Sequence, residues 1–428
     1  MFRDPVHGDL AFPEPLGRRI IALVDTPAFQ RLRHIRQNGV TNLVFHGAEH
    51  SRFSHSLGVA WTAAQMLTAI ERNSALAADE DRQLDTVLAA LLHDIGHGPF
   101  SHTLEEILRD LGVPFDHEVM TKRLMLEHDP GLVDVLGSDH AQRLVDFIDK
   151  ENRTNTRWWH GIVSSQLDAD RLDYVRRDAA MAGIDNHRPD IERLIQNLGV
   201  FEDCIIVAHR AFDVVESFLL ALDHMYEAVY FHRAARAGAV LLSATLRRAA
   251  TILDDAIPTH EDPVRSILEQ GDRIALDRYV RATDASVWVH VDRWRDSKDP
   301  TLRHLANRIS TRSLPRGLDC PTEFRKVNKL AAKAHELTKS AFPELDSKFL
   351  VAIDGPSRVN YKRYVVGEGA HDSIQTMRAG MAKPCAIEDD ERSIVSKVAK
   401  KFYRTRLFVP IEIRNDLVDF ARREHLTG

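Results

Sequence analysis

The apolar residues of the first 250 positions recur every three or four residues, and this period constrains the fold more than any other feature. It runs through segments 15–37, 59–70, 84–92, 118–127, 162–181 and 212–253. Such spacing is typical of helices that bury one face. We therefore expect a mainly α protein whose first 250 residues are almost wholly helical, with strand-like sequence only at 349–353, 361–366 and 406–410.

The composition changes along the chain and suggests three parts. Residues 256–345 are more charged than the segment before them and carry shorter amphipathic runs, still with helical spacing. The strand-like runs follow. We expect a catalytic domain over 1–255, a helical extension over 256–345 and a small mixed α/β element over 346–428. The 428 residues, 44% of them hydrophobic, are enough for a large core.

Net charge and cysteine content narrow the function classes. Lysine and arginine number 57 against 63 acids, a balance of −6, so any anionic ligand must be held by a local cluster. Three scattered cysteines without a CxxC pair argue against a disulfide framework or a thiolate zinc site. No stretch reaches the roughly 18 apolar residues of a membrane span. We expect a cytoplasmic protein with no membrane partner. The basic segment 397–406 could contact phosphates, although a solvated helix face is the favoured interpretation.

Histidines crowd the start of the chain. Nine of the 22 fall within the first 117 residues: His7, His34, His46, His50, His55, His93, His97, His102 and His117. The densest group follows an apolar helix, in Leu91-Leu92-His93-Asp94-Ile95-Gly96-His97-Gly98-Pro99-Phe100-Ser101-His102. An adjacent His-Asp pair offers a nitrogen and an oxygen to one cation, a donor set suited to several transition metals. An isolated pair of this kind could also cap a helix, but glycines on both sides of His97 permit sharp turns and close approach of a ligand.

Two further segments carry matching chemistry. His55 precedes an amphipathic helix and is a candidate third ligand, with Arg52 three residues before it as a candidate phosphate clamp. Downstream, Asp170, Tyr174 and Asp178 are four apart, so one helix face carries two carboxylates and a phenol. A charged surface helix with i,i+4 ion pairs is the alternative there, and it accounts well for Asp173 and Arg177.

The order His55, His93-Asp94, Asp170 resembles the HD-domain phosphohydrolase superfamily. Longer stretches resemble its dNTP triphosphohydrolase branch, which includes bacterial relatives of the vertebrate SAM-and-HD-domain dNTPase. The similar portion runs from residue 2 to about 245 and comprises 2–8, 26–33, 52–59, 93–102, 167–174 and 225–232. The implied fold is a helical HD core with additional helices and a small C-terminal α/β element.

The resemblance also implies a role for individual residues. It places a metal on His55, His93, Asp94 and Asp170, and a catalytic group beside the α-phosphate on His97, His117 and Glu105, with His102 competing with His117 as general acid. It assigns the phosphates to Arg52, Arg171 and Tyr174, and the sugar 3′-hydroxyl to Gln37 and Asp178. Asp25, Gln30 and Arg33 match positions that bind a guanine nucleotide activator at a subunit interface.

This chain departs from the family pattern at four positions. Glu105 replaces an aspartate and should still orient His97, and Arg171 replaces a lysine. Asn38 stands where a leucine lines the sugar pocket of the vertebrate enzyme, which weakens the expected exclusion of ribonucleotides. Val229 lies near the place of a phosphate-contacting arginine.

The expected activity is hydrolysis of a dNTP to a deoxynucleoside and triphosphate. The expected cofactor is a divalent metal, one of Mn, Fe, Zn, Ni or Mg, with Mg accompanying the substrate phosphates. A homo-oligomer, dimer or tetramer, with a nucleotide activator is expected. Two alternatives stay open from the residues: an HD phosphodiesterase or nuclease acting on single-stranded nucleic acid or another nucleotide, and a nucleotide-binding regulator without turnover.

Overall fold

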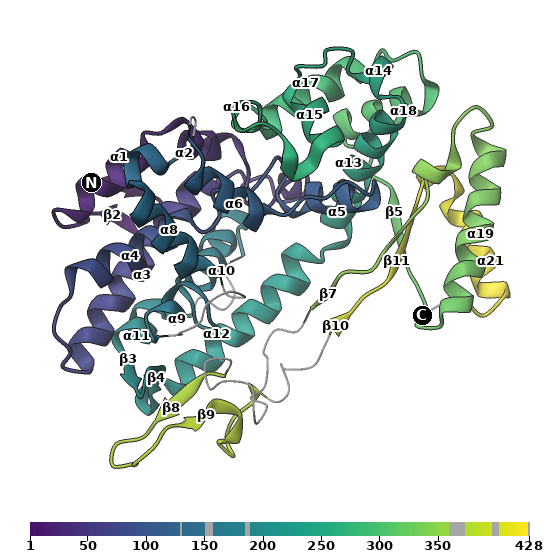
Figure 1. Ribbon diagram of the computed structural model, residues 1–428. Helices are drawn as coiled ribbons and strands as arrows, with labels where there is room; N and C mark the ends of the chain where they lie inside the picture. The colour runs from purple at the N-terminus through teal and green to yellow at the C-terminus, as the bar shows by residue number, and fades with distance from the viewer. Residues whose placement is uncertain (129–130, 150–156, 185–188, 359–372, 396–401, 427–428) are drawn as a thin grey trace.

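Three helices that meet at one end form the centre of the computed structural model, which describes residues 1–128, 131–149, 157–184, 189–358, 373–395 and 402–426. Helix α3 (Arg52–Asn73) packs against both α4 (Glu80–Leu92) and α10 (Ala169–Ala182), as Figure 1 shows. The surrounding helices are α1 (Leu16–Val24), α2 (Pro27–Gln30), α5 (His102–Asp110), α6 (His117–Leu126), α7 (Val133–Leu136), α8 (Ser138–Ile148), α9 (His160–Val163), α11 (Ile191–Gln196), α12 (Phe212–Met225) and α13 (Arg233–Thr251). The expected mainly α class is confirmed.

Local sequence sets where the central helices begin. The Asp79 carboxylate accepts a hydrogen bond from the Arg82 amide and caps α4, and Asp168 caps α10 in the same way through the Arg171 amide. The apolar run at the end of α4 is fully buried, so the residues that follow, His93 and Asp94, emerge from the core. The capped start of α10 lies at the same end of the bundle.

Later helices and short strands complete the molecule. The helices are α14 (Leu253–Ala256), α15 (Pro263–Gln270), α16 (Leu276–Tyr279), α17 (Asp284–Trp294), α18 (Pro300–Ser310), α19 (Phe324–Ala341) and α21 (Arg414–Arg423). The strands are β1 (Phe2–Asp4), β2 (Gly8–Leu10), β3 (Leu198–Phe201), β4 (Cys204–Ala208), β5 (Arg316–Asp319), β6 (Ala352–Asp354), β7 (Ser357–Arg358), β8 (Gln375–Met377), β9 (Cys385–Ala386), β10 (Phe402–Tyr403) and β11 (Arg406–Val409).

The strands form four small sheets. Strands β1 and β2 pair antiparallel, as do β7 and β10, and β11 pairs antiparallel with both β5 and β6. The fourth sheet has the order β3-β4-β8-β9, in which β4 and β8 run parallel. Strands β8 and β9, which come late in the chain, therefore extend the hairpin of β3 and β4, at the bottom of Figure 1.

The described residues form two separate hydrophobic cores. The larger one spans the catalytic region and α15–α18. The smaller one joins α19, α21 and β11, which lie beside one another at the right of Figure 1, through Leu330, Ala334, Leu407, Val409 and Leu417 among others. The boundaries expected at residues 255 and 345 stay predictions, although β5 and α19, which precede residue 345, contribute to this second core.

Several expectations about local structure were wrong. The predicted helix over 212–253 is interrupted by a π-helical turn (Tyr226–Tyr230), and α13 starts anew with His232 as its cap. The predicted helix over 162–181 is interrupted at 164–168, where Asp168 binds the Ser165 amide as well as capping α10. The first 250 residues contain β1 to β4, and segment 256–345 contains β5. The β-branched run Ile205-Ile206-Val207 was a strand signal within the helical region.

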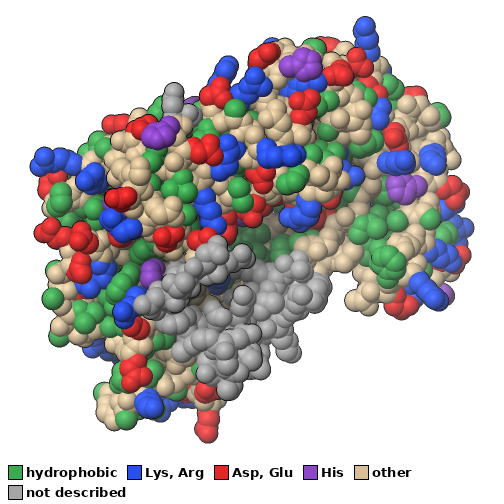
Figure 2. Space-filling view, in the orientation of Figure 1, with side chains coloured by type: hydrophobic (Ala, Val, Ile, Leu, Met, Phe, Trp, Pro, Cys, Tyr) green, Lys and Arg blue, Asp and Glu red, His purple; other side chains and the backbone are tan. Residues whose placement is uncertain are grey.

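The basic segment 397–406 also differs from the favoured interpretation. Residues 397–401 lie outside the described residues, as does the strand expected at 361–366. Residues 402–403 and 406 belong to strands, and the Arg406 side chain is buried, with its Nε atom 3.0 Å from Asp319. Over the face in Figure 2, basic and acidic side chains are interspersed. None of the described helices combines the length and apolar composition needed to span a bilayer.

Candidate functional site

The common end of α3, α4 and α10 brings four metal-ligand candidates together. His55 lies in the first turn of α3 and is 0% exposed, Asp170 lies in the first turn of α10, and His93 and Asp94 follow α4. The Nε2 atom of His55 lies 3.1 Å from an Asp170 oxygen and 3.8 Å from an Asp94 oxygen. The Nε2 atom of His93 lies 3.3 Å from Asp94 and 3.7 Å from Asp170. Two imidazoles and two carboxylates thus converge on one point.

The protonation of the two imidazoles suits a cation. His55 donates from Nδ1 to Asp173 at 2.8 Å, and His93 donates from Nδ1 to the Ala90 carbonyl at 2.9 Å. Their Nε2 atoms are buried and have no hydrogen-bond partner in the part of the chain that the structure describes. Buried acceptors of this kind are normally satisfied, and a divalent metal would satisfy both at once. Ligand atoms of His55, His93 and Asp170 lie within 4.8 Å of one another. The residues fit a metal of the nitrogen- and oxygen-binding class.

Asp173 lies behind His55 and is fully buried. Its carboxylate also accepts from His7 at 2.6 Å and from two nitrogens of Arg177, whose Nη1 binds Asp4 at 2.9 Å. Helices α3 and α10 approach so closely here that a Cβ at Gly58 would lie 2.0 Å from the Asp173 carboxylate. The i,i+4 pair of Asp173 and Arg177 does form, but the alternative of a surface helix does not hold for it, because this side of α10 faces the core.

Electrostatics keep the carboxylates of this group ionised. Burial favours the neutral form of Asp94, but the charges of His93 and Arg52 hold its pKa well below the usual range. Burial acts the same way on Asp170, whose pKa is lowered by hydrogen bonds with His55 and His93. Burial also lowers the pKa of His55, but Asp170 and Asp173 outweigh it and raise the value to about 10. A cation that binds at Nε2 would therefore displace a proton from His55.

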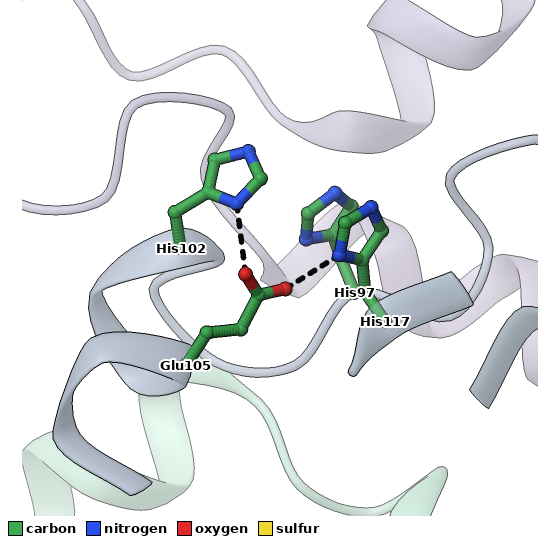
Figure 3. A group of neighbouring side chains, drawn as sticks. All are labelled: His97, His102, Glu105 and His117. Atoms are coloured by element: carbon green, nitrogen blue, oxygen red, sulfur yellow. Dashed lines mark hydrogen bonds and ion pairs between the residues drawn. The ribbon is translucent and has the colours of Figure 1, made fainter. Parts of the chain in front are cut away.

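A second group of titratable residues lies beside the first and is drawn in Figure 3. Glu105 stands between His102 and His117 and accepts a hydrogen bond from the Nδ1 atom of each, at 3.1 and 2.6 Å. The ring of His97 stacks on that of His117 with centroids 4.0 Å apart. The Nε2 atom of His97 lies 3.6 Å from Asp94, which links the two groups.

Glu105 does not orient His97 as expected. It lies one turn after His102 on α5, whereas His97 precedes the bend at Phe100 and Ser101, both of which have positive φ. The pKa values differ accordingly. Burial and the charge of Arg52 hold the pKa of His97 well below its usual range. Burial also lowers the pKa of His117, but Glu105 and Asp94 outweigh it and raise the value. His97 thus favours the neutral form, whereas His117 binds its proton more tightly than a free histidine does.

These groups line one cavity of about 440 Å³. Ten predicted site residues line it: Gln37, Arg52, His93, Asp94, His97, His102, His117, Asp170, Tyr174 and Asp178. His55 and Glu105 stand behind the lining. Arg52 binds Asp94, and its Nε donates to Ser101 Oγ at 2.7 Å. Arg171 is not part of the lining, and its Nε lies 3.8 Å from Asp168.

Part of the cavity lining is polar and lies around Asp178. Asp178 accepts from His50 Nε2 at 2.7 Å and from the Tyr230 hydroxyl at 2.6 Å. Within the described ranges, the buried Oε1 atom of Gln37 and the buried Nδ2 atom of Asn38 have no hydrogen-bond partner. A bound molecule with hydroxyl groups could satisfy both of these atoms.

The three residues predicted to bind an activator lie elsewhere. Arg33 donates to Gln30 at 2.8 Å, and its guanidinium covers the Phe53 ring at 3.5 Å. Gln30 donates to the Val24 carbonyl, and Asp25 is exposed at the end of α1. Their role stays a prediction.

Several residues of this site had no predicted role. His7 and His50 were unassigned, and each binds a carboxylate of α10. Tyr230 and Arg236 line the cavity. Tyr230 falls in the π-helical turn, which turns it toward Asp178. Tyr174, which lies between two acids on α10, indicated that this helix face lines the site. The packing of α12 and α13 near it could not be predicted from local spacing.

Comparison with known proteins agrees with this geometry. Residues 52–150 match the model of the HD domain, and residues 189–341 match that of the HD associated region. An uncharacterised Bacillus subtilis protein, YwfO, is 34% identical over 373 residues, which cover 86% of this chain and 82% of that one. The deoxynucleoside triphosphate triphosphohydrolase SAMHD1 of Danio rerio is 34% identical over 236 residues, 47% of this chain and 36% of that one.

A solved structure extends the similarity to nearly the whole chain. The crystal structure of a phosphohydrolase from Bacteroides thetaiotaomicron superposes with a TM-score of 0.79 at 25% identity, over 95% of this chain and 98% of that one. The matched HD domain contains His55, His93 and Asp94, three of the four convergent ligand candidates. The chain is therefore a member of the HD-domain phosphohydrolase family.

Proposed function

We propose that this chain is a metal-dependent deoxynucleoside triphosphate triphosphohydrolase. The observation that carries the proposal is the single cavity in which a metal group, an arginine, a proton-holding histidine and a polar wall face one another. A nucleotide in this cavity would meet the metal and the arginine with its phosphates, the histidine with its 5′-oxygen, and the polar wall with its sugar. The similarity to named dNTP triphosphohydrolases over the catalytic region supports the substrate class.

The roles follow from the charges. A divalent cation held by His55, His93, Asp94 and Asp170 would supply a water of lowered pKa and offset phosphate charge. Arg52 neutralises charge that develops on the phosphoryl oxygens, a contribution that is usually large. A water oxygen bonds to the α-phosphorus as the bond from phosphorus to the 5′-oxygen breaks.

The leaving 5′-oxygen needs a proton, and His117 is our first candidate for the donor. Its pKa is raised, and Glu105 keeps Nδ1 bound, so Nε2 is the nitrogen that donates. His102, exposed and bound to the same carboxylate, is the second candidate for this step. At the sugar end, Asp178 and Gln37 would bind the 3′-hydroxyl. Tyr174 would bind phosphate from α10, and Arg171 would have to turn away from Asp168 to assist.

A substrate panel tests the proposal. Each dNTP, each rNTP and a labelled single-stranded oligonucleotide is incubated with Mn, Fe(II), Ni, Zn or Mg, and products are separated by ion exchange. We expect a deoxynucleoside and tripolyphosphate from one or more dNTPs. Shortened oligonucleotide with intact dNTPs would instead show a nuclease. Bound dNTP without product under every metal would show a regulator.

We also propose that Asp25, Gln30 and Arg33 bind a guanine nucleotide between subunits. Initial-rate kinetics with and without GTP, followed by gel filtration, test this point. A lag that GTP removes, with formation of a tetramer, is expected, and Arg33→Ala should abolish it. Hyperbolic kinetics in a fixed oligomer would contradict it.

A further inference from the structure

We infer that Tyr279 and Asp284 are positioning residues that hold two loops beside the cavity. One is the loop 95–101, which carries His97, and the other is the loop with Ile35 and Arg36, which supports Arg52 at the start of α3. Tyr279 ends α16 and Asp284 begins α17, both within the HD associated region. Neither residue lines the cavity. The inference rests on the proposed roles of His97 and Arg52 in catalysis.

Tyr279 binds the loop that carries His97. Its side chain is fully buried, and its hydroxyl donates to the Gly96 carbonyl at 2.5 Å. Arg31 stacks over the tyrosine ring at 4.5 Å and donates from Nη2 to the carbonyls on either side, Ile95 at 2.7 Å and His97 at 2.8 Å. The carbonyls of three consecutive residues, 95–97, are thus held by hydrogen bonds from Arg31 and Tyr279. Position 96 has no room for a side chain, because a Cβ there would meet the His117 carbonyl at 2.1 Å.

Asp284 binds both loops at once. One carboxylate oxygen accepts from the Phe100 amide at 2.8 Å, and the other accepts from the Arg36 amide at 2.9 Å. Phe100 has a φ of 56°, which is unfavourable for a residue with a side chain and persists only where the surroundings enforce it. The Phe100 ring also packs edge-on against Trp288 of α17. The associated region therefore enforces the bend between His97 and α5.

The same two loops hold Arg52. Its amide donates to the Ile35 carbonyl at 2.9 Å, and its Nε donates to Ser101 Oγ at 2.7 Å. Ser101 Oγ lies 3.4 Å from the Arg36 carbonyl. Asp284 binds the neighbouring residue on each loop, Arg36 and Phe100, so a shift of its carboxylate would move both supports of Arg52.

The burial of Asp284 argues against a role in packing alone. Its side chain is 3% exposed and lacks an ion pair among the described residues, and burial raises its pKa to about 6. An apolar side chain would occupy this place at lower cost. What the carboxylate adds is two acceptors, and both are used on the loops.

Two small substitutions test the inference, with one matched control. Tyr279→Phe removes only the hydroxyl, and Asp284→Asn keeps the shape but replaces one acceptor by a donor. Asp262→Asn is the control, because the Asp262 carboxylate lies in the same region and likewise accepts from two amides, Val264 and Arg265. It also binds His290 of α17 at 2.9 Å, but it contacts neither loop. For each variant we would measure kcat and KM for dNTP hydrolysis, bound metal, and hydrogen exchange of peptides covering 95–104.

We expect kcat to fall about 10- to 100-fold in the two test variants, as for other residues that orient catalytic groups, with KM changed less than about twofold. Exchange over 95–104 should accelerate, while metal content stays at the wild-type level. The control should match wild type in every readout.

Unchanged exchange over 95–104 in both test variants would overturn the inference, whatever the substrate. A kcat within twofold of wild type would overturn it as well, as would a loss that the Asp262 variant shares. If the wild-type protein hydrolyses no dNTP, the proposed function fails, but the exchange measurement still decides whether Tyr279 and Asp284 hold the loops.

Discussion

The two histidine groups of the cavity differ in what binds their Nδ1 atoms. In the metal group, His55 and His93 donate from Nδ1 to buried acceptors behind them, so each Nε2 atom points toward the carboxylates of Asp94 and Asp170. In the group of Figure 3, His102 and His117 donate to one ionised carboxylate, Glu105. The first arrangement presents lone pairs to a cation. The second raises the pKa of His117 and holds a proton beside the cavity.

We expect the largest effect on bound metal and on activity when ligands of the metal group are removed. The double substitution His93→Ala with Asp94→Ala deletes one nitrogen and one carboxylate ligand and should abolish both bound metal and hydrolysis. Metal content by mass spectrometry and product release measure the two losses. Full activity in this variant would refute the assignment of the metal group.

Removing the carboxylate of the second group should have a smaller and different effect. We expect Glu105→Gln to retain metal and to lose about 10²- to 10⁴-fold in kcat, the usual range for acid and base assistance. Glu105 raises the pKa of His117, so its loss should lower that pKa. Because the protonated form is the active one, the alkaline limb of the kcat profile should move to lower pH.

Asp110→Asn is the matched control for Glu105→Gln. Asp110 lies on the same helix, is exposed and pairs with Arg247 at 3.2 Å, away from the histidines. Its pH profile should equal that of wild type. An unshifted alkaline limb in Glu105→Gln would exclude His117 as the proton donor.

The third prediction concerns the acceptor behind His55. Asp173→Asn should weaken metal binding about 10- to 100-fold, and excess metal should restore most of the activity, unlike in Glu105→Gln. Asp4→Asn is the control, because it also removes a carboxylate from Arg177 but touches neither His55 nor His93. Calorimetric titration with Mn measures both affinities, and equal values would show that Asp173 does not tune the metal group.

The four residues predicted as metal ligands lie together in the structure, and the signals for them in the sequence are local. A His-Asp pair after an apolar helix, glycines beside His97 and carboxylates at helical spacing each restrict the chain within a few residues. The partner of Glu105 was also within reach, since His102 lies three residues before it on one helix. The expectation that Glu105 orients His97 came from the resemblance, and the bend at Phe100 and Ser101 was not considered.

What could not be predicted depends on packing between distant segments. Asp173 and Arg177 have the same i,i+4 spacing whether their helix face is buried or exposed, and only the close approach at Gly58 decides it. The π-helical turn that interrupts the predicted helix over 212–253 contains no glycine or proline that would have indicated it. Tyr279 and Asp284 lie in a segment whose sequence indicated only short charged helices, and their contacts to Gly96 and Phe100 span most of the catalytic region.

The parallel pairing of β4 with β8 bears on how the chain can be synthesised and shortened. Ile206 pairs with Gln375, so this sheet closes only after the intervening residues 207–374 have emerged from the ribosome. Pairings across such long separations form slowly. A fragment that ends before residue 375 would leave the edge of β4 uncovered, and open edges promote aggregation. The catalytic region should therefore be expressed together with β8 and β9, even though neither strand contributes a residue to the cavity.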